Sequence, residues 1–129
     1  MYRKLTFIII FLSVLFLSCS GPNENSLEDV ETWTFTWQSG YISGSQTQFD
    51  SYLWQFLSES QWNNIKSYAV ERDTFANVSW DTVVSWLNNW DFPENVIREF
   101  KNKLASNERA THFYRNSDDE YFWVRLLKE

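Results

Sequence analysis

The chain has one thiol and one imidazole, and their positions limit the chemistry that they can share. Cys19 follows an apolar N-terminal segment, whereas His112 belongs to the C-terminal part of the chain. A cysteine nucleophile needs a nearby base, and the usual zinc sites need three or four such ligands. The folded body therefore cannot assemble a Cys–His catalytic pair or a Cys/His zinc site. We expect His112 to lie on a sheet surface rather than to act as a general base.

Carboxylates are the other candidates for chemistry. The run Asp118-Asp119-Glu120 supplies oxygen atoms but lacks the spaced acids of a calcium loop, so we interpret it as an acidic hairpin turn. Pairs such as Asp81 with Asp91, or Glu71 with Asp73, could cleave glycosides only at a separation that the sequence leaves open. No phosphate-binding glycine loop or nucleophile elbow occurs. We therefore predict a protein that is not an enzyme and that uses no metal and no cofactor.

The segment before Cys19 is typical of an export signal. Arg3 and Lys4 precede a nearly unbroken apolar run from Leu5 to Leu17. As a helix at ~1.5 Å per residue this run spans about 20 Å, short of the ~30 Å hydrocarbon core, so it fits a cleaved signal peptide better than a permanent span. An odd cysteine in an exported chain is a reactive thiol, an intermolecular disulfide or a modified residue.

The residues Leu15-Phe16-Leu17-Ser18-Cys19 resemble the lipobox of bacterial lipoproteins, with Phe16 where that family usually has leucine. The resemblance implies that residues 1–18 are a lipoprotein signal peptide and that Cys19 becomes the first mature residue, with three acyl chains. One chain gives only marginal membrane binding, so three would anchor the protein stably. The implied location is the bacterial cell envelope, and Ser20 favours the outer membrane in a Gram-negative cell. An ordinary cleaved secretory leader and a retained single-span anchor are the alternatives.

The charge of the chain restricts its partners. The net charge is −6, and loss of Arg3 and Lys4 with the leader would change it to −8. Nucleic acid and anionic lipid both require a basic surface, so we predict no nucleic-acid binding and a membrane attachment through lipid alone. The acidic charge permits a basic partner, but it is also what a solubilising surface provides.

Polar and turn-forming residues then give way to an aromatic segment. Residues 19–30 comprise the lipidated Cys19 and a flexible tether, because almost nothing there can be buried. From residue 31 onward, Trp33, Phe35 and Trp37 alternate with threonines, which predicts a β-strand. Its aromatic face is either a platform for a sugar ring or a peptide, or one side of a strand packed under helices.

The middle of the chain has helical periodicity, with four apolar stripes. The first predicted helix carries Phe49, Tyr52, Leu53, Phe56 and Leu57. The second follows a cap at Ser58–Ser60, and the third follows a loop over residues 73–78 and a cap at Ser79. The fourth restarts at Pro93. The stripes of the last three helices consist of Trp62, Ile65 and Ala69; Trp80, Val83, Val84 and Leu87; and Val96, Ile97, Phe100 and Leu104.

Strand-forming residues return near the C-terminus. Residues 111–115 and 121–127 are rich in β-formers and flank a polar turn, which predicts a hairpin. We expect one face to carry Phe113 with Phe122, Val124 and Leu126. We expect the other face to carry His112 and Tyr114 with Tyr121, Trp123 and Arg125.

Together these patterns predict an α+β fold in one small domain over residues 31–129, with about four helices, an N-terminal strand and a C-terminal β-hairpin. The leading functional hypothesis is a lipid-anchored interaction module that presents exposed aromatic side chains to a protein partner. The alternative is a carbohydrate-binding lipoprotein that stacks sugar rings on such side chains. The candidate binding residues are Trp33, Trp37, Tyr121 and Trp123.

Overall fold

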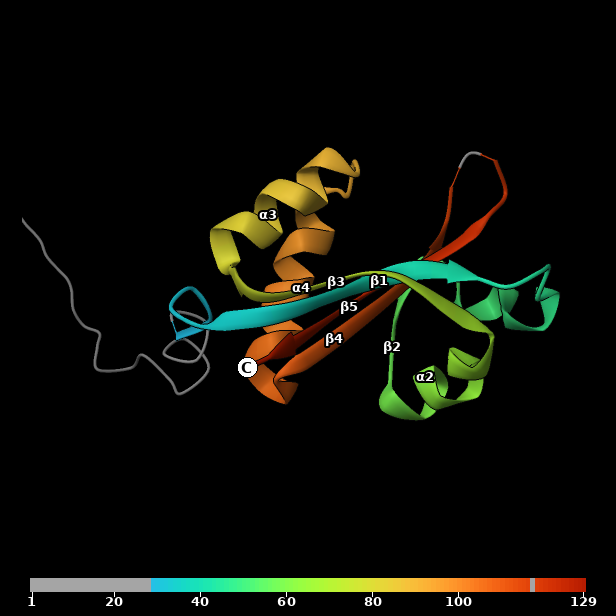
Figure 1. Ribbon diagram of the computed structural model, residues 1–129, viewed down its shortest axis with the longest axis horizontal. Coiled ribbons are helices and arrows are strands. Elements are labelled where there is room, and N and C mark those ends of the chain that lie inside the picture. The colour runs from blue at the N-terminus through green and yellow to red at the C-terminus, as the bar shows by residue number, and fades with distance from the viewer. Residues whose placement is uncertain (1–28, 117) are drawn as a thin grey trace, which may run out of the picture.

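Five antiparallel strands form one sheet in the order β2-β4-β5-β1-β3 (Figure 1). The computed structural model describes residues 29–116 and 118–129. The strands are β1 (Thr34–Ile42), β2 (Gln55–Leu57), β3 (Ala69–Ser79), β4 (Arg109–Arg115) and β5 (Tyr121–Lys128).

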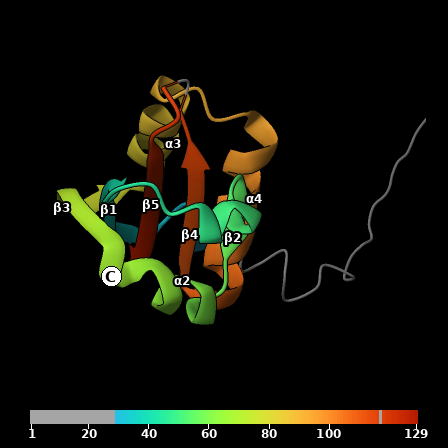
Figure 2. The same cartoon turned by 90° about the vertical axis from the view of Figure 1, so that its right-hand side faces the viewer.

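Helices cover both faces of the sheet (Figures 1 and 2). One face packs against α3 (Trp80–Asn89) and α4 (Glu94–Asn107), with a core that includes Phe35, Trp37, Phe100, Val124 and Leu126. The opposite face packs against the 3-10 helix η1 (Thr47–Tyr52) and α2 (Glu59–Ile65), which continues into the 3-10 helix η2 (Lys66–Tyr68). Its core includes Phe49, Leu57, Ile65, Phe113 and Trp123. We call these the α3–α4 face and the α2 face.

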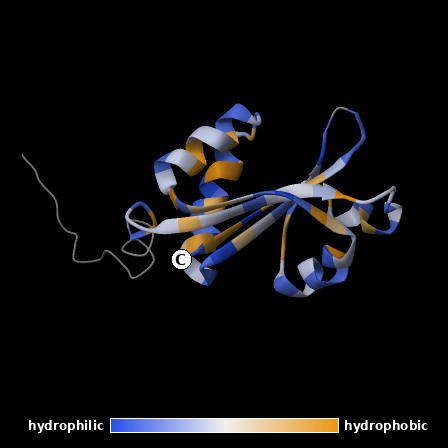
Figure 3. Ribbon diagram, in the orientation of Figure 1, coloured by the Kyte–Doolittle hydropathy of each residue, from blue (hydrophilic) through white to orange (hydrophobic). Residues whose placement is uncertain are grey.

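The α+β class is confirmed, but the arrangement of strands is not the predicted one. The alternating segment around Trp37 is β1, and the C-terminal hairpin is β4 and β5. Two further strands, β2 and β3, are interspersed among the helices. Hydrophobic segments occur in the helices on both sides of the sheet and at intervals along the strands, whereas the β4–β5 hairpin is hydrophilic near its tip (Figure 3).

The first predicted helix is largely wrong. Its start is η1, but the chain leaves the helical path at Trp54, which has a φ of 61° and donates its backbone N–H to the Phe113 carbonyl at 2.6 Å. Phe56 then packs on the α3–α4 face and Leu57 on the α2 face. This alternation has a period of two, because β2 adds to the edge of the hairpin at β4.

The predicted loop over residues 73–78 is also wrong, because that segment belongs to β3. This strand pairs with β1 from Ala69 opposite Ile42 to Ser79 opposite Thr34, and it is interrupted by two bulges. Most of its side chains are exposed, as expected for an edge strand. Gly40 permits the close approach of β1 and β3, because a Cβ atom there would lie 1.9 Å from the Val70 carbonyl oxygen.

The helix starts follow the sequence signals. Ser58 and Gln61 form a reciprocal capping box at the start of α2, and the Ser79 side chain accepts a hydrogen bond from the Thr82 backbone N–H at 3.2 Å. Pro93 occupies the position before the first residue of α4. These caps place α2, α3 and α4 close to their predicted starts.

The hairpin is confirmed, but its predicted division into faces is wrong. Phe113 lies opposite Trp123, and His112 lies opposite Val124. Directly opposed residues share a face, so Phe113 belongs with Trp123 on the α2 face. His112 and Tyr114 belong with Val124 on the α3–α4 face. The register between the two strands, which the sequence alone does not specify, decides this division.

The N-terminal boundary of the folded body lies slightly earlier than predicted. Val30, which the sequence assigned to the tether, is fully buried in the core of the α3–α4 face. Its neighbour Glu31 forms an ion pair with Lys101 of α4 at 2.6 Å. The signal peptide of residues 1–18 and the lipidation site Cys19 lie outside the described residues.

A buried arginine attaches α2 to the sheet. Arg125 of β5 is 7% exposed, and its two terminal nitrogens each lie 2.9 Å from an oxygen of Glu59 in the first turn of α2. One of these nitrogens also donates to the Thr111 hydroxyl at 2.7 Å, and the guanidinium lies over the Trp62 ring. These contacts lower the pKa of Glu59, chiefly through the hydrogen bonds from Arg125.

His112 is buried beneath aromatic rings, contrary to the prediction of a sheet-surface residue. It is 3% exposed and packs against Phe56, Phe92 and Phe100, and its Nδ1 atom has no hydrogen-bond partner among the described residues. Burial lowers the pKa of His112 from its usual 6.5 to about 4.

The folded state favours the neutral imidazole, so protonation of His112 does not lower the free energy of unfolding above about pH 6.5. As the pH falls from there toward 4, protonation lowers the free energy of unfolding progressively, by up to about 3 kcal/mol. We expect His112→Phe to remove this component and to flatten the pH dependence of the free energy of unfolding. Urea titrations of both proteins at pH 7.5 and 4.5 test this. Equal losses of stability in the two proteins would contradict it.

Candidate functional site

Three of the four predicted binding residues lie in the core. Trp37 and Trp123 are each 2% exposed, and Tyr121 is also buried. The indole N–H groups donate to the Ser39 hydroxyl at 3.0 Å and to the Tyr41 carbonyl at 3.1 Å. Their rings therefore offer no face to a ligand, and the prediction that they bind one is corrected.

Contacts within the chain also account for the side chains of Tyr121 and Trp33. Tyr121 donates a hydrogen bond to the Asp50 carboxylate, which raises the pKa of the Tyr121 phenol and joins β5 to η1. Trp33 is half-buried at the start of β1, and the Lys128 ammonium lies 4.0 Å from the centre of its ring. The Lys128 ammonium thus already covers one face of the Trp33 ring.

Different aromatic side chains are exposed at the hairpin end of the sheet. Among the described residues, Trp54 at 59% and Trp90 at 42% are the tryptophans that reach solvent most fully. Tyr41 is also exposed, while Tyr114 and Phe122 are half-buried and stack on each other at 5.8 Å. We call the area formed by these five residues and the polar groups between them the hairpin-end surface.

Three adjoining hollows mark this surface. The tryptophan hollow, of about 450 Å³, is lined by Trp54, Trp90, Asp91, Phe92, Pro93, Tyr114, Arg115 and Asn116. The central hollow, of about 330 Å³, shares Trp90, Tyr114 and Asn116 with it. The tyrosine hollow, of about 550 Å³, shares Arg72 and Phe122 with the central one. Through these shared residues the three hollows form one continuous area.

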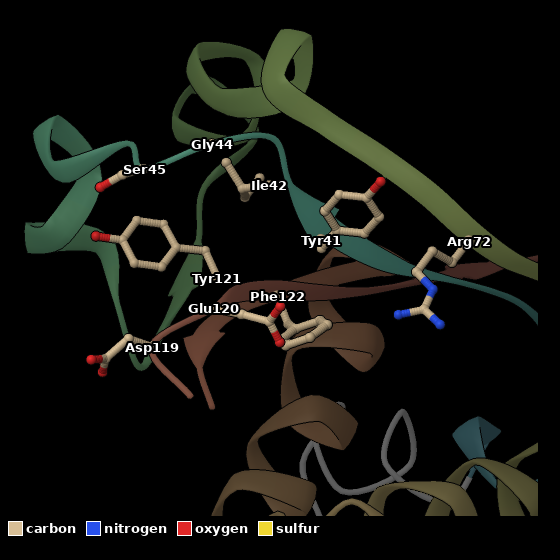
Figure 4. A pocket seen from close by; sticks show the side chains of 9 residues that line it. All are labelled: Tyr41, Ile42, Gly44, Ser45, Arg72, Asp119, Glu120, Tyr121 and Phe122. Atoms are coloured by element: carbon tan, nitrogen blue, oxygen red, sulfur yellow. The ribbon is translucent and has the colours of Figure 1, made fainter. Parts of the chain in front are cut away.

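Figure 4 shows the tyrosine hollow, to which several segments contribute. Tyr41 comes from β1 and Phe122 from β5, and Glu120 lies beside Phe122 at the hairpin turn. Arg72 comes from β3, where it is the extra residue of a bulge between the partners of Ser39 and Gly40. A bulge redirects a side chain, and the Arg72 guanidinium forms no ion pair with any described residue.

Two residues of the tryptophan hollow have a positive φ. Asp91, at 64°, follows α3, where Asp91 and Phe92 donate their backbone N–H groups to the Asn88 and Leu87 carbonyls, and aspartate tolerates this conformation. Trp54 has a φ of 61°, which costs a bulky L-residue about 1–2 kcal/mol. Glycine or asparagine would suit that backbone better, yet the position carries a tryptophan that is 59% exposed.

The hairpin-end surface presents aromatic faces, amide groups and charges. The imidazole is buried, and no group of three or more potential metal ligands occurs in the part of the chain that the structure describes. Asp81 and Asp91 lie at opposite ends of α3, about 15 Å apart along its axis, which exceeds the separation that glycosidases use. The Glu71 carboxylate accepts a hydrogen bond from Thr74.

The sequence contained a signal for this surface that periodicity did not detect. Trp90 stands in the polar break Asn89-Trp90-Asp91 after α3, and Trp54 ends the irregular segment between η1 and β2. A tryptophan in a turn between two elements has no helix or strand face on which to be buried. Only the tertiary fold, however, brings the two turns to the same hollow.

Comparison of the chain with known protein-family models, with curated proteins and with solved structures found no match. Among the described helices, none is both long and apolar enough to cross a membrane.

We expect the replacement Trp54→Asn to leave the stability of the fold within about 1 kcal/mol of the parent, because asparagine tolerates a positive φ and little buried area is lost. The matched control Trp123→Ala removes a buried indole and should cost about 3–5 kcal/mol. Urea unfolding measures both values. A loss for Trp54→Asn as large as that of the control would make Trp54 a structural residue.

Proposed function

We propose that the protein is a lipid-anchored lipoprotein of the bacterial cell envelope and that its folded domain is a non-enzymatic module for binding a protein partner. The observation that carries the binding role is the pair of exposed tryptophans, Trp54 and Trp90, on one hollow ringed by polar groups. Exposed aromatic side chains with a polar rim are typical of protein interaction sites. The anchor is supported by the resemblance of residues 15–19 to a lipobox.

The position of the hairpin-end surface suits an anchored receptor. Residues 29–33 and the start of β1 lie beside the C-terminal end of β5, with Phe35 opposite Lys128. The other end of β1 lies beside the hairpin, with Tyr41 opposite Phe122. Residue 29, where the described chain begins, and the hairpin-end surface thus lie at opposite ends of the sheet (Figure 1), about 30 Å apart along β1. A tether that joins the domain at residue 29 would therefore leave this surface free for a partner.

Carbohydrate binding is the alternative, and it has less support. It requires exposed rings that lie in nearly one plane, as a platform for a sugar. The closest approach to this is the stacking of Tyr114 on Phe122, with an interplanar angle of 27°, but both rings are half-buried. Of the rings predicted for this role, Trp37 and Trp123 are in the core.

The lipid anchor predicts a specific mass. In a Gram-negative host, the chain purified from membranes should begin at Cys19 and carry added acyl mass. Cys19→Ala should carry no lipid and should keep its leader, because the modified thiol is what the lipoprotein peptidase recognises. Ser20→Ala is the control that keeps the thiol and should be processed normally. Intact-mass measurement of the parent protein and of both variants tests this. An unmodified polypeptide from the parent protein would refute the lipid anchor.

The binding role predicts crosslinking from one end of the domain. A photoreactive phenylalanine analogue in place of Tyr41 should give a discrete protein adduct in intact cells, and combination with Trp54→Asn should weaken it. The same analogue at Asn102, an exposed position of α4 away from the hairpin, is the control. Absence of an adduct at position 41, or equal labelling at both positions, would contradict a binding role for this surface.

A further inference from the structure

We propose that the tryptophan hollow binds the side-chain cation of a lysine or arginine, presented by a basic segment of the protein partner. This inference rests on the proposed binding function and specifies the chemistry of the ligand. It depends on the exposed aromatic rings of the hollow, on the carboxylate among them and on the charges at the hairpin-end surface.

The hollow offers exposed aromatic rings to a ligand. Trp54 is 59% exposed, and its ring lies 5.8 Å from that of Tyr114 at an angle of 45°, so these two rings touch and a ligand can reach only the remaining surface of the indole. Trp90, which is 42% exposed, lines the same hollow. The face of an exposed indole attracts an organic cation. A sugar ring would instead need a flat platform of rings.

The charges nearby favour the same ligand. The three hollows are lined by four carboxylates, from Asp73, Asp91, Asp119 and Glu120, and by two guanidiniums, from Arg72 and Arg115. Within the tryptophan hollow itself, Arg115 lies 3.7 Å from the Asp119 carboxylate, which offsets its charge. The chain as a whole carries a net charge of −6. The surface therefore attracts a basic segment and repels an acidic one.

The hollow contains a carboxylate together with the aromatic rings. Trp54 supplies a ring and Asp91 a carboxylate to the lining of the same hollow. Burial raises the pKa of Tyr114, so its phenol stays neutral and leaves Asp91 as the acidic group of this hollow. An aromatic ring and a carboxylate are the two kinds of group that attract an ammonium or a guanidinium.

The test uses the full chain in a neutral polyoxyethylene detergent, because zwitterionic detergents contain quaternary ammonium groups and glycoside detergents contain sugars. The probe is acetylated tetralysine amide, with the corresponding tetraglutamate and the neutral tetrasaccharide maltotetraose as comparisons. The measurement is the shift of the indole N–H signals of Trp54 and Trp90 in ¹⁵N-resolved NMR spectra at low and high salt. The tetralysine should shift both signals, and high salt should weaken its binding.

Two variants locate the site. Trp54→Asn should weaken tetralysine binding by about threefold to thirtyfold, because it removes one aromatic wall. Asp91→Asn should weaken it by about twofold to fivefold. Glu108→Gln is the matched control, because Glu108 also has a positive φ after a helix but lies at the other end of the sheet. It removes the same charge and should leave the affinity unchanged.

The possible outcomes separate this inference from the proposed function. Equal shifts with tetraglutamate, or equal effects of Asp91→Asn and Glu108→Gln, would overturn the cation site. Binding of maltotetraose in place of tetralysine would also overturn it and would assign the surface to glycans. If neither probe binds, the cation site fails, while crosslinking at position 41 still decides whether the surface binds a protein.

Discussion

Strand β5 carries large side chains on both of its faces, and the rest of the structure depends on covering them. Trp123 packs on the α2 face, whereas Val124 and Leu126 pack on the α3–α4 face. Solvation of either face would expose a large apolar area, so the chain needs a helical layer on each side. It supplies one layer from residues 47–68 and the other from residues 80–107.

The α2 layer is small, and polar contacts fix its position. Arg125 lies on the same face of β5 as Trp123, and burial of an unpaired guanidinium would cost several kcal/mol. Glu59, Thr111 and the Trp62 ring satisfy this charge. Because Glu59 is the first residue of α2, the same contacts determine where the helix sits. Hydrophobic burial thus stabilises the packing of this layer on the sheet, and the Arg125–Glu59 ion pair fixes the position of α2 along β5.

The two layers leave the hairpin end of the sheet uncovered, and the candidate binding surface lies there. Its aromatic residues come from β1, β4, β5 and the two turns that carry Trp54 and Trp90. Trp37 is 2% exposed, whereas Trp54 is 59% exposed and has a positive φ. Buried indoles such as Trp37 stabilise the sheet, and the exposed indoles are available to the proposed partner.

Local signals in the sequence were sufficient for the elements that local interactions specify. Ser58 and Ser79 cap helices by contacts within one helical turn. Aromatic and polar side chains alternate along β1 with the period of a strand, and both strands of the hairpin are rich in β-forming residues. The net charge and the presence of a single cysteine and a single histidine likewise restricted the expected partners and the expected catalytic groups from the sequence alone.

Tertiary structure decided what depends on distant partners. The segment at Phe56 has a helical stripe but becomes a strand, because an edge of the hairpin offers it backbone hydrogen bonds. Residues 73–78 resemble a loop because edge strands avoid apolar side chains, yet they pair with β1. The sequence by itself supplied eight tryptophans and predicted that they would fill much of the core. Only the fold determined which of them are buried and which reach solvent, because the burial of a ring depends on the segments that pack over it.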